Sequence, residues 1–91
     1  MNSNVKGFIQ YCKNNIRNNN RKIRGLRGRI SEYEAIIDIM TRTDINKQIL
    51  KSYKEKIDKC FTKIDNCLED NKNSYDLIRV MGRVNGIINE R

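Results

Sequence analysis

Proline, histidine and tryptophan are all absent from this sequence of 91 residues, and the first two absences carry consequences. Without proline, no residue interrupts a helix by lacking a backbone N–H or by clashing with the preceding turn. Without histidine, the commonest general base is missing. We therefore expect a mostly helical, non-enzymatic protein with no cofactor, no metal site and no small-molecule substrate.

Long apolar runs are absent as well. No stretch approaches the ~20 apolar residues that a bilayer crossing needs, and residues 1–6 lack the apolar core of a secretory signal. The cysteines, Cys12, Cys60 and Cys67, are odd in number and are not spaced as metal ligands. We expect reduced thiols in a cytoplasmic protein that has no membrane partner.

Acidic residues are absent from the first third of the chain. Residues 1–31 hold eight of the 19 lysines and arginines and none of the 11 acids, so residues 32–91 hold the other eleven cations and all eleven acids. The whole net charge of +8 therefore lies in residues 1–31. A basic segment beside a neutral remainder indicates an anionic partner.

The chain does contain apolar residues that recur at alternating steps of four and three, which is the heptad pattern of packed helices. In the first half, the seam begins at Val5, and position a is isoleucine in five heptads. The seam then has Ile9, Ile16, Ile23, Ile30 and Ile37 at a with Cys12, Asn19, Leu26, Tyr33 and Met40 at d. The second seam has Leu50, Ile57, Ile64, Asn71, Ile78 and Asn85 at a with Tyr53, Cys60, Cys67, Ser74, Met81 and Ile88 at d.

Two such seams predict two long helices, over about 4–40 and 44–90, joined by a turn within 41–46. Thr43 or Asp44 is the expected N-cap of the second helix, because its side-chain oxygen can accept an orphan N–H. Helices joined by so short a turn must pack antiparallel. The predicted fold is all-α, a coiled-coil-like helical hairpin that forms one domain over residues 1–91.

The register of the hairpin can be predicted from its polar seam residues. With the turn centred near residue 45, Asn19 faces Asn71, and the two amides can satisfy each other. A neighbouring register would place Asn19 against Cys67 and leave its amide without a partner. The paired asparagines favour the first register, since a buried polar layer fixes alignment.

Breaks near 19–30 and 70–74 would give an alternative with three to four helices. Gly25 and Gly28 each cost about 1 kcal/mol against alanine inside a helix, and Ser31 followed by Glu34 fits a capping box. Asn73 or Ser74 could cap a further helix. The four-segment version covers residues 4–18, 31–41, 44–70 and 74–90.

Apolar residues outside the seams predict an interaction surface. A two-helix hairpin has no third layer to cover them, so they imply dimerisation into a four-helix bundle, a fold-back of the end segments, or a docking face for another protein. The residues that we assign to this protein-interaction face are Phe61, Leu68, Tyr75, Leu77, Val80 and Val84.

The functional hypothesis rests on the basic stretch at 17–29 and its surroundings. Arginine suits phosphate through its planar donor fork. The stretch therefore predicts contact with a nucleic acid or an acidic protein surface, and the alternative is a solvated face that only keeps the protein soluble. The residues assigned to the contact are Lys13, Arg17, Arg21, Lys22, Arg24, Arg27 and Arg29. The predicted function is binding to nucleic acid or to a nucleic-acid-processing complex. The alternative is an inhibitor or adaptor of the phage or mobile-element type that docks on a host protein, a class typical of this composition rich in asparagine, isoleucine and lysine.

Overall fold

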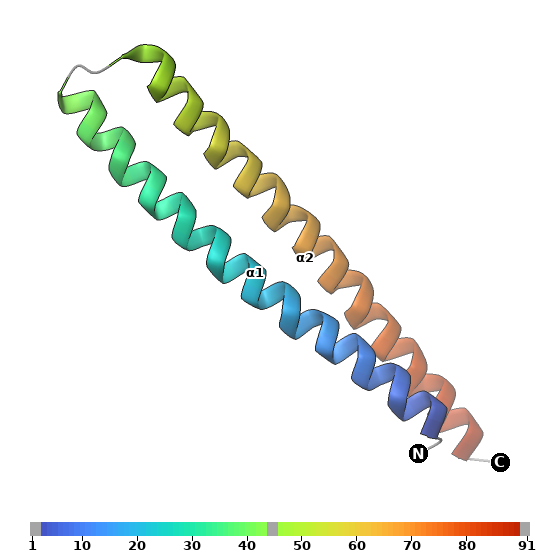
Figure 1. Cartoon of the computed structure of the whole chain (residues 1–91). Helices are drawn as coiled ribbons and strands as arrows, with labels where there is room; N and C mark the ends of the chain where they lie inside the picture. The colour runs from blue at the N-terminus through green and yellow to red at the C-terminus, as the bar shows by residue number, and fades with distance from the viewer. Residues whose placement is uncertain (1–2, 44–45, 90–91) are drawn as a thin grey trace.

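The computed structural model describes residues 3–43 and 46–89, with side chains through residue 86. Two helices make up the regular structure of this part of the chain: α1 (Ser3–Arg42) and α2 (Lys47–Asn89). They lie side by side and antiparallel, so the start of α1 and the end of α2 are at the same end of the hairpin (Figure 1). The molecule measures 71 × 14 × 14 Å. The predicted all-α helical hairpin is confirmed.

Both seams face each other as the heptad pattern predicts. In α1 the buried seam residues are Val5, Cys12, Ile16, Asn19, Ile23, Leu26 and Ile30. In α2 they are Cys60, Ile64, Asn71, Ser74 and Asn85, and the other seam residues through Met81 are half-buried. The core therefore runs as a narrow strip between the two helices, and its centre is the cluster of Ile23, Leu26, Ile30, Cys60 and Ile64.

The register is the one in which the two asparagines meet. The Asn19 side-chain amide donates to Asn71 Oδ1 at 3.0 Å and to Asp70 Oδ2 at 2.6 Å. The Asn71 amide in turn donates to Asn20 Oδ1 at 3.0 Å. Asn15 donates to the same Asp70 oxygen at 2.9 Å. We call these residues the asparagine layer, and because both central amides are paired, it aligns the helices without leaving a buried group unsatisfied.

The alternative division into three to four helices does not occur among the described residues. Helix α1 continues through Gly25, Gly28 and Ser31, so Ser31 is not an N-cap. Helix α2 likewise continues through Ser74, whose buried hydroxyl accepts a hydrogen bond from Asn15 at 3.3 Å. Packing of the apolar seam on both sides of each weak point outweighs a local cost of about 1 kcal/mol per glycine.

The turn differs in detail from the prediction. Asn46 is the N-cap of α2, because its Oδ1 accepts the Gln48 N–H at 2.9 Å and its carbonyl accepts the Leu50 N–H at 3.3 Å. The prediction of Thr43 is wrong, since its hydroxyl donates back to the Ile39 carbonyl at 2.9 Å and so closes the end of α1. Asp44, the other predicted cap, lies outside the described residues.

The seam leaves two long edges where side chains of both helices flank the core. The g edge carries heptad position g, which comprises residues 8, 15, 22, 29 and 36 of α1 and 49, 56, 63, 70, 77 and 84 of α2. The e edge carries position e, which comprises residues 13, 20, 27 and 34 of α1 and 54, 61, 68, 75 and 82 of α2. The bond between Asn15 and Asp70 joins two g residues and so shows that these positions meet across the seam.

Candidate anion-binding surface

All seven basic residues predicted to bind a partner lie on α1 and are exposed: Lys13, Arg17, Arg21, Lys22, Arg24, Arg27 and Arg29. The ion pairs between described residues, Arg42 with Asp38 and Arg79 with Asp76, involve none of them. No hydrogen bond between described side chains engages them either. Their charges are therefore available to an external anion.

The helix divides these cations between both edges of the hairpin. Lys22 and Arg29 lie on the g edge, whereas Lys13 and Arg27 lie on the e edge, with Arg17 and Arg24 beside it at position b. Arg21 lies at position f, on the side of α1 that faces away from α2. Because successive residues of a helix are about 100° apart, this one basic stretch of sequence places positive charge on several sides of α1.

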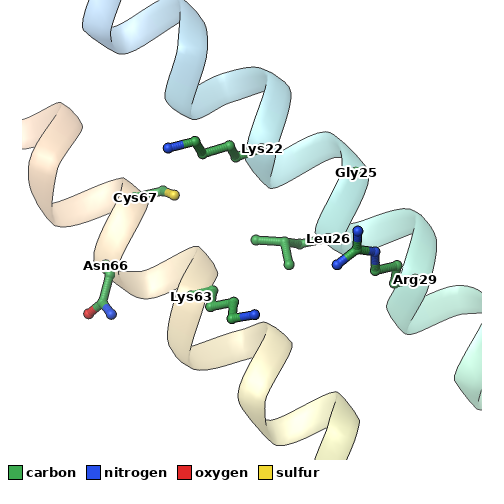
Figure 2. A pocket seen from close by; sticks show the side chains of 7 residues that line it. All are labelled: Lys22, Gly25, Leu26, Arg29, Lys63, Asn66 and Cys67. Carbon is green, nitrogen blue, oxygen red and sulfur yellow. The ribbon is translucent and has the colours of Figure 1, made fainter.

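A groove of about 450 Å³ lies on the g edge between the two helices. The residues that line it are Lys22, Gly25, Leu26 and Arg29 of α1 with Lys63, Asn66 and Cys67 of α2. Figure 2 shows Lys22, Leu26 and Arg29 reaching from α1 toward α2, and Lys63 reaching from α2 toward α1. The groove therefore has an apolar floor at the seam and three cations around its rim.

A second groove, of about 360 Å³, lies on the e edge. It is lined by Asn20, Ile23, Arg24 and Arg27 of α1 and by Leu68 of α2. Here arginines border an exposed leucine, so this groove offers both charge and apolar surface.

The six residues assigned to protein interaction are also exposed, and they too are divided between the edges. Phe61, Leu68 and Tyr75 follow the e edge at intervals of seven residues and are 49%, 46% and 59% exposed. Leu77 and Val84 lie on the g edge, and Val80 lies next to it at position c. The two groups are therefore separate apolar patches.

The contribution of α2 to the basic surface was not predicted from the sequence. Lys63 and Asn66 line the same groove as Lys22 and Arg29, although they are about forty residues away in the sequence. The missed signal was the heptad position, because Lys56 and Lys63 both occupy g in the second seam. The net charge of the first third of the chain gives no information about this clustering.

Other kinds of site find no support in the described residues. Within 3–43 and 46–89, no three histidine, cysteine, aspartate or glutamate residues are grouped so that they could hold a metal ion. The described helices contain no stretch that is both long and apolar enough to cross a membrane. Cys12 and Cys60 are buried free thiols, and Cys67 is half-buried. Comparison with protein-family models, curated proteins and solved structures finds no match to this chain.

Proposed function

We propose that this hairpin is a non-enzymatic binding protein that engages nucleic acid, or a complex that processes nucleic acid, through its basic stretch at 17–29. The observation that carries the proposal is the exposure of all seven cations of α1, free of any ion pair with the described acids. A neighbouring acid cancels part of the positive potential of a cation. Cations that have no such acid beside them keep their full attraction for phosphate.

The expected mode of binding is contact with the phosphate backbone. Arginine presents a planar fork of N–H donors that matches phosphate oxygens, and a continuous helix fixes the spacing of the four arginines at 21, 24, 27 and 29. Such contacts position a nucleic acid without reading its sequence. Binding therefore depends steeply on salt, because each neutralised phosphate releases counterions.

The test removes these four arginines together. We expect Arg21→Gln, Arg24→Gln, Arg27→Gln and Arg29→Gln in one chain to abolish binding to random duplex DNA and RNA. Far-UV circular dichroism should remain unchanged, because all four side chains are exposed and glutamine favours helix as arginine does.

A matched control removes the same charge elsewhere. Lys47, Lys51, Lys54 and Lys72 are exposed on α2 and line neither groove. If the quadruple glutamine variant of these lysines binds as weakly as the arginine variant, net charge alone explains binding. If the arginine variant binds as the wild type does, the proposal is wrong.

The second candidate function is an inhibitor or adaptor that docks on another protein. It is favoured by the e edge, where Phe61, Leu68 and Tyr75 stay exposed beside Arg24 and Arg27. A partner with an acidic and apolar surface would cover both. The two candidates differ in a salt titration, since absence of nucleic-acid binding even at low salt favours the protein partner.

Self-association is part of the same proposal. Apolar residues at intervals of seven follow a helix edge as a further seam would, so a second copy can cover Phe61, Leu68 and Tyr75 in a four-helix bundle. Sedimentation equilibrium measures the oligomeric state directly. Leu68→Glu should convert a dimer to a monomer, whereas Gln48→Glu, away from the edge, should not.

A further inference from the structure

The g edge brings together cations that two regions of the sequence supply. Lys22 and Arg29 of α1 and Lys63 of α2 surround one groove. Between them Gly25 leaves the rim open, and even an added Cβ would meet no atom within 4 Å. The groove of about 450 Å³ is many times the ~30 Å³ that one water occupies, so it has room for more than one phosphate group.

A fourth cation extends the same edge. Lys56 lies seven residues before Lys63, which is about 10 Å along the helix. Its ammonium group is held 4.8 Å from the ring centroid of Tyr53 and 5.8 Å from that of Tyr33. Cation–π attraction therefore favours a position of the ammonium group near the seam, although Lys56 is exposed.

The four cations form two opposed pairs of like charge. Moving one heptad along both helices from the bonded pair Asn15 and Asp70 places Lys22 opposite Lys63, and a second heptad places Arg29 opposite Lys56. Antiparallel helices are stabilised when opposite charges meet at such positions, and like charges there destabilise the pairing.

The acids of α2 do not relieve this repulsion. Asp58 and Asp65 lie at position b, beyond the e edge, and Glu55 and Glu69 lie at position f, away from α1. Asp70 is on the g edge, but it lies about 10 Å along the helix from Lys63 and forms no ion pair with a described cation. On α1, Glu32 lies near the edge, and it forms no ion pair with a described cation.

We propose that this groove is a phosphate-binding site shared by both helices, with Lys22 and Arg29 on one side and Lys63 on the other, and that Lys56 extends the site along the same edge. A phosphate group that lies between opposed cations attracts both of them and so replaces their repulsion. Its binding therefore also stabilises the hairpin. The groups come either from a nucleic-acid backbone, in which case the site rests on the proposed function, or from free polyphosphate.

The test variant is Lys56→Gln with Lys63→Gln, and the control is Lys51→Gln with Lys72→Gln, which removes the same charge outside the groove. The first probe is inorganic tripolyphosphate, and the readout is the melting temperature of the hairpin by circular dichroism. We expect tripolyphosphate to raise the melting temperature of the wild type and the control. The test variant should bind it about tenfold or more weakly, because it lacks two charge-assisted contacts.

Without any added anion, removal of a like charge from the groove should stabilise the hairpin. The single variant Lys63→Gln, which keeps the cation–π contacts of Lys56, should melt at a higher temperature than the wild type, because its like-charged pair with Lys22 is gone. A rise of the same size in Lys51→Gln would mean that general charge repulsion, and not the opposed pair, is relieved. That result would overturn the inference, as would a wild type whose melting temperature tripolyphosphate leaves unchanged.

The second probe, random duplex DNA, identifies the source of the phosphate. If the slope of log affinity against log salt is shallower by about 1.8 in the test variant alone, the groove contacts two backbone phosphates. If tripolyphosphate binds in the groove and DNA does not bind, the site stands and the proposed function fails. If DNA binds both variants equally and tripolyphosphate does not distinguish them, the proposed function stands and the groove inference fails.

Discussion

The asparagine layer allows a quantitative test of how the hairpin chooses its register. Asn19 and Asn71 are each 6% exposed, and together they make three hydrogen bonds to each other, to Asp70 and to Asn20. We consider Asn19→Leu, which suits a d position, and Asn71→Ile, which matches the isoleucines at a. The single and double replacements should have opposite effects on stability.

The single variant Asn19→Leu should lose stability. It removes two hydrogen bonds, at about 1 kcal/mol each. It also leaves the buried Asn71 Oδ1 without its donor, which costs about 2 kcal/mol, while the buried leucine returns about 2 kcal/mol. The expected net effect is a loss of about 2 kcal/mol in the free energy of unfolding.

The double variant should be more stable than the wild type. It forfeits three hydrogen bonds, about 3 kcal/mol, and buries two apolar side chains worth about 4 kcal/mol together. Asp70 keeps its bond from Asn15 and Asn20 is exposed, so no buried group remains unpaired. The expected gain is about 1 kcal/mol, with a loss of register specificity because the neighbouring alignment no longer buries a lone amide.

Urea denaturation followed by far-UV circular dichroism measures both variants. It should be repeated at several protein concentrations, so that self-association does not contribute unnoticed. The reasoning is refuted if the effects of the two single replacements simply add. In that case the two asparagines do not form one coupled layer.

Three further predictions concern local features. Gly28→Ala should raise the free energy of unfolding by about 1 kcal/mol, since a Cβ there meets no atom within 4 Å. Urea denaturation measures this change, and a lower free energy of unfolding would indicate a break in α1. Asn46→Ala should cost about 1 kcal/mol because the Gln48 N–H loses its acceptor, whereas Asn46→Asp should cost little. Thiol labelling of the native protein should be slow at Cys12 and Cys60, which are 2% and 6% exposed, and somewhat faster at the half-buried Cys67; fast labelling of Cys12 and Cys60 would contradict the seam.

Much of the fold was predictable because helix packing is periodic. Heptad spacing alone identified the residues that are buried in α1, including the polar Asn19. The pairing of Asn19 with Asn71 could also be predicted, since two amides in one layer are more stable together than apart. Local signals were less reliable, because Ser31 and Ser74 carry capping chemistry and yet lie inside continuous helices.

The candidate site was only half predictable. The seven cations of α1 are adjacent in sequence, and their exposure follows from their positions outside the seam. Which of them act together does not follow from sequence proximity. Lys22 shares a groove with Lys63, whereas Arg24, two residues further on, lines the groove on the opposite edge.

The sequence by itself determined two long helices, an antiparallel seam and an uneven charge. Apolar periodicity and net charge are properties of the chain that no neighbour can alter. Tertiary structure alone decided that the helices continue through Gly25 and Gly28, that Asn46 caps α2, and that lysines of α2 join the basic groove. These outcomes depend on packing and on contacts across the seam, whose energies exist only once the two helices lie side by side.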